Sequence, residues 1–351
     1  MMIAIDWGSS HFRALLLDER GNVLQRSESD QGIFSDHFQS NRKAETFATI
    51  VEKHCHPWIK EFGPMPYYLG GMVGSRSGWV ETDYVDSQHW LSALSSQLVE
   101  CSLANGHIIP GVATRKDDGN WDVMRGEEIQ ILGALQILDI GNRALTICLP
   151  GTHSKWADIS TRSNSHELDD ARVDKARIDK TRDEEKWSDG KIEKFSTFMT
   201  GELFQWAQQK SSLAPLMKPP QNNNLEAAAI NRDAFVEGVN ASASKQPLSQ
   251  SLFSIRANHL MATTPHKDPS DYLSGLLIGE EVRAALAAND HQRQLVIIGN
   301  PKLADRYQLA LKTLNREAHY IDGEQAFCQG VSVIHALAKH PLHPENPRAN
   351  A

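Results

Sequence analysis

A carboxylate and two hydroxyl side chains follow the first apolar run of the chain. Asp6 ends that run, and Gly8, Ser9 and Ser10 form a turn before a second apolar run begins. Backbone N–H groups in such a turn can form an anion-binding nest, to which the serine hydroxyls add donors for phosphate oxygens. A carboxylate at the strand end can hold a hydrated magnesium ion that bridges nucleotide phosphates. We therefore expect Asp6 to be linked to the metal and the turn to contact phosphate, with a purely structural hairpin as the alternative.

A second turn of this kind lies about 140 residues later. An apolar strand pattern precedes Gly151, Thr152 and His153, and another apolar run ends at Gly299 and Asn300. Two such turns indicate two domains that hold one phosphate chain from opposite sides. Ligands lie at the carboxyl ends of strands in α/β sheets, where a glycine lets a flat adenine approach the backbone. We expect the second turn to bind phosphate and Gly299 with Asn300 to bind adenine.

The elements around these turns alternate between strand and helix patterns. Strand patterns cover a hairpin over 2–17 and the segments 23–27, 67–69, 107–109, 144–149, 155–159 and 295–298. Helical spacing covers 46–62, 88–100, 127–138, 201–209, 272–287, 303–314 and 325–338. Strands interleaved with helices predict an α/β fold.

Composition favours a globular protein that acts on small molecules. With 351 residues the chain exceeds one average domain, so we expect two domains. The net charge of -8 argues against nucleic acid or an anionic membrane as the main partner. No apolar stretch approaches the roughly 20 residues of a membrane span, and no signal-peptide pattern precedes the first strand. Together with four scattered cysteines, these features lead us to expect a cytoplasmic protein.

Two segments differ from the rest of the chain. Residues 161–194 are dense in alternating charge and poor in apolar side chains, so we expect a non-catalytic insertion, either a solvated helix or a mobile excursion. The tail 340–351 carries three prolines and is expected to be unstructured.

Six motifs carry a resemblance to a known family. They read, in chain order, IAIDWGSSHFRA, GGMVGSRSGW, VMRGEEIQILGA, PGTHSKW, MTGELF and LSGLLIGEEV. The layout of the two turns and of the strand that ends at Gly299 and Asn300 resembles the actin, hexokinase and Hsp70 ATPase superfamily. The six motifs together resemble the 2-dehydro-3-deoxygalactonokinase family over about residues 2–338, outside the insertion. The resemblance implies two ribonuclease-H-like (actin-like ATPase) domains with an interdomain active-site cleft. The first would span residues 1–140 with helix 324–339, and the second residues 141–323.

The resemblance also implies an activity. It is ATP-dependent phosphorylation of 2-dehydro-3-deoxy-D-galactonate to its 6-phosphate in galactonate catabolism, with ATP and Mg²⁺ as cofactors. A homodimer is the oligomer that we consider. The alternatives are a kinase for another 2-keto-3-deoxy sugar acid, such as a gluconate derivative, an exopolyphosphatase-like phosphohydrolase, or a non-enzymatic nucleotide-binding regulator. The second turn lacks the Gly-Gly-Gly-Ser-Thr-Glu sequence typical of exopolyphosphatases.

Two adjacent glutamates are candidates for the catalytic base. Glu127 and Glu128 lie where a loop enters a helix. In the sugar kinases that the chain resembles, an acidic residue at this point in chain order contacts the acceptor hydroxyl. We expect Glu127 to be the base, with Glu128 as the alternative. The helix dipole alone also favours acids at a helix start, and many of these kinases use aspartate, which leaves the choice between the two open.

The acceptor implied by the resemblance carries a carboxylate, so its pocket needs a cationic partner. The basic candidates are Arg13, Arg76, Arg125 and Lys155. The glycine-rich loop resembles the sugar-facing loop of related kinases and adds Gly74, Ser75 and Trp79, with core packing as the alternative for Trp79.

Overall fold

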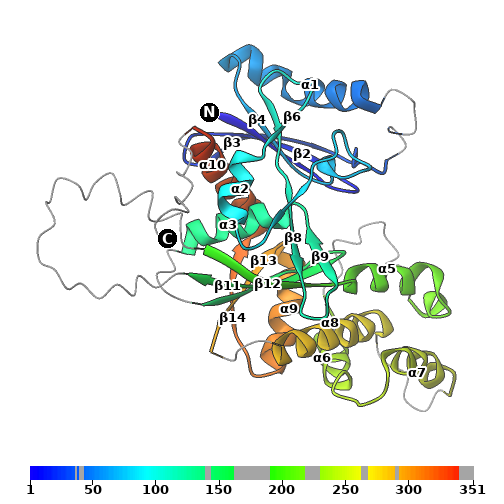
Figure 1. Cartoon of the computed structure of the whole chain (residues 1–351). Helices are drawn as coiled ribbons and strands as arrows, with labels where there is room; N and C mark the ends of the chain where they lie inside the picture. The colour runs from blue at the N-terminus through cyan, green and yellow to red at the C-terminus, as the bar shows by residue number, and fades with distance from the viewer. Residues whose placement is uncertain are drawn as a thin grey trace, which may run out of the picture. The chain divides into compact units, whose positions relative to one another are not determined.

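The structure, a computed structural model, describes residues 1–35, 38, 43–138, 144–161, 190–217, 230–261, 268–288 and 292–339 (Figure 1). By its internal contacts the chain divides into two units. Unit 1 comprises residues 1–144, 157–195 and 321–351, and unit 2 comprises residues 145–156 and 196–320.

A six-stranded sheet forms the centre of unit 1. Its order is β3 (Val23–Ser29), β2 (Phe12–Leu17), β1 (Met2–Trp7), β4 (Tyr67–Gly71), β7 (Gly106–Ile108) and β6 (Val99–Glu100). The central strand β1 pairs antiparallel with β2 and parallel with β4. Nearly every residue of β1 is buried, as is typical of a strand covered on both faces. The register places Asp6 opposite Arg13 on one side and Gly70 on the other.

Four helices and a small sheet accompany the six-stranded sheet in unit 1. The helices are α1 (Lys43–Phe62), α2 (Trp90–Ser96), α3 (Glu127–Leu138) and α10 (Gly323–Lys339), and the short 3₁₀ helix η2 spans Met72–Gly74. The small sheet has the order β5 (Tyr84–Asp86), β8 (Gly111–Arg115) and β9 (Trp121–Met124). Helices α3 and α10 pack closely against each other. A Cβ at Gly133 of α3 would lie 1.7 Å from the carbonyl oxygen of Ala326, so the two backbones touch.

A five-stranded sheet contains the two strands that flank the second turn. Its order is β12 (Gly190–Phe198), β11 (Ser154–Thr161), β10 (Leu145–Leu149), β13 (Gln294–Gly299) and β14 (Ala318–Asp322). Strands β10 and β13 are parallel, with Cys148 opposite Ile297. Because parallel strands end at the same edge, Pro150 and Gly299 lie together there, with 3.7 Å between Pro150 and a Cβ built on Gly299.

Helices make up most of unit 2. They are α5 (Thr200–Lys210), α6 (Arg232–Ala241), α7 (Leu248–Met261), α8 (Pro269–Ala287) and α9 (Pro301–Thr313), with the 3₁₀ helix η3 at Ala214–Leu216. Helices α6 and α8 lie side by side (Figure 1). A Cβ at Gly275 would lie 2.0 Å from the carbonyl oxygen of Phe235, so this crossing also depends on glycine.

The predicted α/β class is confirmed, and several predicted elements need correction. The predicted helix over 88–100 is wrong in length, since α2 ends at Ser96 and β6 follows. Residues 190–194 of the predicted insertion lie in strand β12. The rest of the insertion from residue 162, and the tail 340–351, lie outside the described residues. The predicted domain limits stay a prediction.

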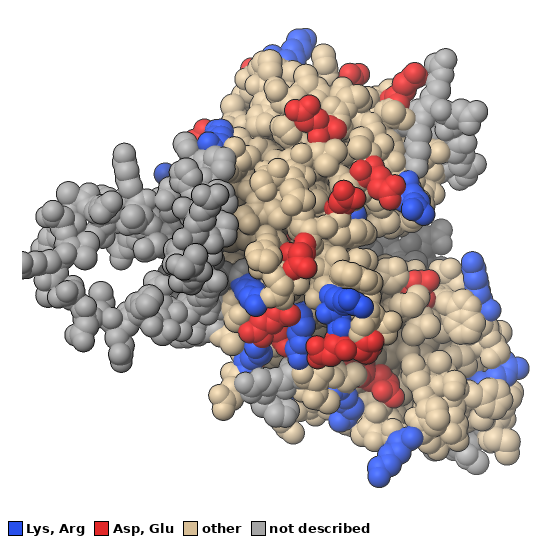
Figure 2. All heavy atoms as spheres, in the orientation of Figure 1, with Lys and Arg blue, Asp and Glu red and all other residues tan. Residues whose placement is uncertain are grey.

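Two observations concern the surface. On the face drawn in Figure 2, acidic and basic side chains of the described residues are interspersed. None of the described helices has the length and apolar character needed to cross a membrane.

Candidate active site

Backbone hydrogen bonds hold the first turn in place and leave its two serine side chains exposed. The N–H of Gly8 donates to the carbonyl of His11 at 3.0 Å and closes the turn between β1 and β2. The carbonyls of Gly8 and Ser9 each accept a hydrogen bond of 3.1 Å from the backbone that follows Gly32. A Cβ on Gly32 would lie 2.3 Å from the backbone of Ser10, so this bracing segment sits directly against the turn. Ser9 and Ser10 remain exposed, as a phosphate contact requires.

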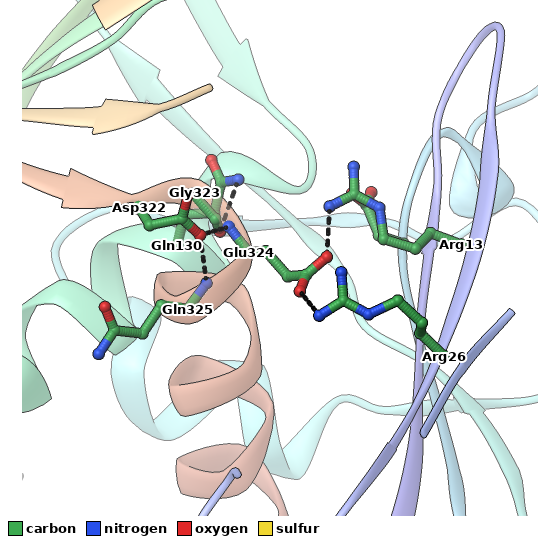
Figure 3. Close-up of polar contacts among 8 residues, drawn as sticks. Arg13, Arg26, Gln130, Asp322, Gly323, Glu324 and Gln325 are labelled. Carbon is green, nitrogen blue, oxygen red and sulfur yellow. Dashed lines mark hydrogen bonds and ion pairs between the residues drawn. The ribbon is translucent and has the colours of Figure 1, made fainter. Parts of the chain in front are cut away.

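Asp6, near the end of β1, belongs to a cluster of charged groups. The Nη2 atom of Arg13 lies 3.8 Å from Oδ2 of Asp6, and its Nη1 atom donates to Oε2 of Glu324 at 3.2 Å. The other oxygen of Glu324 lies 3.1 Å from Nη2 of Arg26. Figure 3 shows Glu324 reaching from α10 toward both arginines. The cluster therefore ties the C-terminal helix to strands β2 and β3 of unit 1.

The surroundings of Asp6 favour a cation beside it. Burial raises the pKa of the Asp6 carboxyl above its ordinary value. The nearby carboxylates of Glu127 and Glu324 raise this pKa further, while Arg13 opposes the shift. The described residues contain no group of three or more His, Cys, Asp or Glu arranged to hold a metal. Mg²⁺ is commonly held by one or two carboxylates together with substrate phosphates, and Asp6 is a carboxylate donor of that kind.

Two glycines set the start of α3 against the end of β4. Gly71 has φ +89° and Gly126 has φ +107°, conformations that glycine adopts without strain. A Cβ on Gly126 would lie 3.3 Å from the Cα of Gly71, so the two backbones touch. Because Gly71 follows the residue that pairs with Asp6, this contact brings the two predicted base candidates near Asp6.

The two glutamates have different environments. Glu127 is half-buried, and its Oε2 accepts the N–H of Arg125 at 3.0 Å. Glu128 is fully buried, and its oxygens accept the N–H of Gly126 at 2.8 and 2.7 Å. Burial, with a smaller contribution from Glu127, raises the pKa of Glu128 to about 8. Glu127 is therefore the glutamate that a ligand can reach, and it acts electrostatically on both Asp6 and Glu128.

Arg125 holds the glycine-rich loop in place. Its guanidinium donates to the hydroxyl of Thr82 and, at 2.9 Å, to the carbonyl of Thr82, and it lies 4.3 Å from the ring centroid of Tyr84. A Cβ on Gly74 would lie 2.8 Å from Nη1 of Arg125, so the loop closes over this side chain. Arg125 thus connects the loop to the start of α3.

The remaining loop candidates differ in accessibility. Ser75 donates to the carbonyl of Met72 at 2.7 Å. Arg76 has 90% of its side chain exposed, with its Nε 3.6 Å from Glu81. Trp79 stacks on Phe47 at 5.5 Å between ring centroids and packs against the core of unit 1.

The second turn packs on the start of α5 within unit 2. A Cβ on Gly201 would lie 2.4 Å from the carbonyl oxygen of Gly151, and the N–H of Glu202 donates to the carbonyl of Thr152 at 3.0 Å. His153 and Glu202 also meet through their side chains at 2.5 Å. Lys155 is buried and donates to the carbonyl of His153 at 3.3 Å. Thr152 and His153 are exposed on a turn that is fixed at several points.

A pocket of about 300 Å³ lies beside this turn. Its lining residues are Gly151, Thr152, Thr200, Gly201, Phe204, Gln205, Ser274, Leu277, Ile278, Leu303, Arg306 and Tyr307. The predicted adenine ligands Gly299 and Asn300 are not among them. The carbonyl of Gly299 accepts from the hydroxyl of Tyr320 at 3.1 Å, and the side chain of Asn300 caps α9 by accepting the N–H of Lys302 at 2.9 Å.

Sequence reasoning missed most of this pocket wall. Six of its residues fall in the motifs MTGELF and LSGLLIGEEV, which the sequence analysis used only for the family resemblance. Arg306 and Tyr307 lie on α9, outside every quoted motif. Only the packing of α5, α8 and α9 brings these side chains together.

Comparison with known proteins covers both units. The profile of the 2-keto-3-deoxy-galactonokinase family matches residues 6–166 and 184–334. A probable 2-dehydro-3-deoxygalactonokinase from Rhizobium meliloti (strain 1021) is 31% identical over 97% of this chain and 97% of the relative. The 2-dehydro-3-deoxygalactonokinase of Escherichia coli (strain K12) is 30% identical over 96% of this chain and 98% of the relative.

A solved structure is also similar. A crystal structure described as that of a 2-dehydro-3-deoxygalactonokinase protein from Sinorhizobium meliloti aligns with a TM-score of 0.75 at 30% identity. The alignment covers 97% of this chain and all of that chain. The chain therefore belongs to the 2-keto-3-deoxy-galactonokinase family.

Proposed function

We propose that the protein is a kinase that transfers the γ-phosphoryl group of ATP to the terminal hydroxyl of 2-dehydro-3-deoxy-D-galactonate. The observation that carries this proposal is the extent of the family match, which includes the carboxylates of unit 1 and the turn and pocket of unit 2. The names of the two curated relatives supply the substrate.

The nucleoside is assigned to unit 2. The pocket of about 300 Å³ is at the lower end of the size range of ligand sites and would take the nucleoside. The adjoining turn, with Gly151, Thr152 and His153, would hold phosphates. We keep Gly299 and Asn300 as nucleotide neighbours, since they lie at the same sheet edge as the turn. The exposed first turn, with Gly8, Ser9 and Ser10, is proposed to contact phosphate as well.

Asp6 is proposed as the protein ligand of Mg²⁺. Its side chain is 32% exposed, and partial burial together with the nearby carboxylates of Glu127 and Glu324 raises the pKa of its carboxyl group. A divalent cation beside this carboxylate would relieve the repulsion between the negative charges. Bound Mg²⁺ neutralises charge that develops on the transferring phosphoryl group.

Glu127 is proposed as the base that orients the acceptor hydroxyl and takes up its proton. It is accessible, whereas Glu128 is fully buried against the backbone of Gly126. Arg13 is proposed to pair with the acceptor carboxylate, because it lies beside Asp6 and a guanidinium has five N–H donors. Gly74, Ser75 and the exposed Arg76 would form the loop that faces the sugar acid.

The proposed activity is tested by a coupled assay of ADP release with ATP, Mg²⁺ and a panel of 2-keto-3-deoxy sugar acids. We expect acid-dependent ADP release that is fastest with the galactonate derivative. Faster turnover with the gluconate derivative would assign a different acceptor. ADP release that does not depend on any acid would favour a phosphohydrolase and overturn the kinase proposal.

A further inference from the structure

Glu324 is the carboxylate to which Arg13 is bonded, and the proposed function gives it no role. Strands β1 and β2 are antiparallel, and their register places Asp6 directly opposite Arg13. Opposite positions of such a pair are close neighbours, between which unlike charges attract. Nη1 of Arg13 nevertheless donates to Glu324 at 3.2 Å, while its Nη2 lies 3.8 Å from Oδ2 of Asp6, beyond hydrogen-bond distance. The guanidinium is therefore bonded to the acid of α10 rather than to its cross-strand neighbour.

The backbone at the start of α10 holds Glu324 in a defined place. The side chain of Asp322 accepts the N–H groups of Glu324 and Gln325, both at 3.0 Å, and so caps the first turn of the helix (Figure 3). The side-chain amide of Gln130 on α3 donates to the carbonyl of Gly323 at 3.3 Å. Because the helix start is fixed at these points, its carboxylate can fix the position of Arg13 in turn.

The two acids beside Arg13 are not equivalent for a cation. One oxygen of Glu324 accepts from Arg13 and the other lies 3.1 Å from Nη2 of Arg26, so both face a guanidinium group. The side chain of Asp6 is 32% exposed, against 22% for Glu324. An arginine and a metal ion compete for the same lone pairs of a carboxylate. Asp6 is therefore the better donor to a cation as long as Arg13 stays with Glu324.

We propose that Glu324 is a positioning residue that holds Arg13 away from Asp6 and so leaves the Asp6 carboxylate available to Mg²⁺. This inference rests on the proposed function, which makes Asp6 the ligand of Mg²⁺. Without the charge of Glu324, Arg13 would turn toward its cross-strand neighbour and pair with it. The metal ion would then have to displace a guanidinium group before it could bind.

The test measures how much Mg²⁺ strengthens nucleotide binding to the full chain, without acceptor. Titration calorimetry with adenylyl imidodiphosphate, an ATP analogue that resists hydrolysis, gives a dissociation constant in Mg²⁺ and another in EDTA. The ratio of the two constants is the Mg²⁺ effect, and Asp6→Asn shows how much of it depends on Asp6. Glu324→Gln should lower the Mg²⁺ effect by about 3- to 10-fold, the strength of one hydrogen-bonded pair of partly exposed charges. It should change the affinity in EDTA less than 2-fold.

A second comparison removes Arg13 as well. If Glu324 acts by holding this arginine, Arg13→Gln should restore the Mg²⁺ effect in the Glu324→Gln background and change it much less in the unchanged protein. If Glu324 acts only by attracting the cation through its charge, Arg13→Gln should raise the Mg²⁺ effect by the same factor in both backgrounds. Glu28→Gln is the matched control, because Glu28 is an exposed acid opposite Arg13 on β3. It should change the Mg²⁺ effect less than 2-fold.

Two results would overturn the proposal. One is a Mg²⁺ effect that Glu324→Gln leaves unchanged. The other is a loss in Glu324→Gln that Arg13→Gln does not restore, or an Arg13→Gln effect that is equal in both backgrounds. A loss without restoration is expected if Glu324 serves only to begin α10, where the helix dipole favours an acid.

Two further outcomes are decisive as well. If Glu324→Gln does not fold, Glu324→Asp, which withdraws the carboxylate by one methylene, must lower the Mg²⁺ effect, and an unchanged effect contradicts the proposal. If Mg²⁺ does not strengthen binding to the unchanged protein, or if Asp6→Asn leaves the Mg²⁺ effect intact, the proposed metal role of Asp6 is itself contradicted, and this inference falls with it.

Discussion

At the scale of single residues, Arg13 is the side chain whose role is most open to a direct test. It lies between two carboxylates, 3.2 Å from Glu324 and 3.8 Å from Asp6. Two contacts do not exhaust the five donors of a guanidinium, so Arg13 can hold a carboxylate of the acceptor and still keep Asp6 in place.

Arg13→Gln should therefore raise KM for the sugar acid by about 10- to 100-fold, which corresponds to one lost charge-assisted hydrogen-bonded pair. KM for ATP should change much less. Steady-state kinetics with each substrate varied in turn provides the measurement. Arg26→Gln is the control, because Arg26 pairs with the same Glu324 but is 61% exposed. A rise in KM for ATP alone would mean that Arg13 serves only to hold Asp6.

Glu128 makes stability depend on pH with a defined sign. Its pKa is about 8 in the folded chain, against an ordinary value of 4.5, so the folded chain keeps a proton that the unfolded chain releases. The free energy of unfolding therefore falls as pH rises from about 4.5 to about 8. Glu128→Gln removes this term, so the variant should gain stability relative to the unchanged protein across that window. Chemical denaturation at several pH values measures the difference. A difference in unfolding free energy between Glu128→Gln and the unchanged protein that stays constant with pH would contradict this prediction. Glu61→Gln, at an exposed position of α1, is the control.

The sequence predicted part of the site for identifiable reasons. Asp6 lies near the end of a strand and Glu127 at the start of a helix, and the apolar patterns of the sequence locate both of these positions. In the structure the carboxylate of Glu127 is close enough to raise the pKa of Asp6. The burial of Glu128 was not predictable, because adjacent glutamates look alike until the helix face is known. Tyr307 and Arg306 were missed because they become pocket residues only when α9 packs beside α5 and α8.

At the scale of elements, each unit contains a pair of helices whose backbones come into contact at glycine residues. In unit 1, Gly133 of α3 faces the backbone of α10, and Gly330 of α10 faces the backbone of α3. In unit 2, Gly238 of α6 and Gly275 of α8 do the same for each other. A methyl group added at one of these glycines would meet backbone atoms, which cannot rotate away as a flexible side chain can. The two helices would therefore have to move apart.

Gly133→Ala and Gly275→Ala should each lower the free energy of unfolding by about 1–3 kcal/mol or more, the cost of overpacking a close contact. Gly299→Ala is the control, because its added Cβ meets nothing closer than 3.7 Å. Denaturant titration measures all three. Unchanged stability in the two helix variants would mean that these crossings tolerate a wider spacing.

The elements that the sequence analysis located well are those whose residues form continuous apolar runs. The helix over Glu127–Leu138 and the strands β1 and β13 follow buried runs. Strand β9 was not predicted, since it exposes Trp121 and Val123 and buries Asp122. In this strand the apolar side chains are exposed and a charged side chain is buried, so a rule that equates apolar with buried does not find it.

At the scale of the whole molecule, the proposed tasks of the two units complement each other. Unit 1 holds Asp6, Glu127 and Arg13, a set suited to a cation and an anionic acceptor. Unit 2 contains the second turn, which packs against the start of α5, and a pocket beside it, and both are suited to a nucleotide. Hydrolysis of ATP is the competing reaction for any such kinase, so water must be kept from the reacting phosphate.

The most direct test of this assignment follows the γ-phosphoryl group itself. Protein, Mg²⁺, γ-³²P-labelled ATP and 2-dehydro-3-deoxy-D-galactonate are incubated, and labelled sugar-acid phosphate is separated from labelled inorganic phosphate. We expect the label to enter the 6-phosphate of the sugar acid, and Glu127→Gln to lower this transfer at least 100-fold while ATP still binds. Label appearing only in inorganic phosphate, or full transfer by Glu127→Gln, would contradict it.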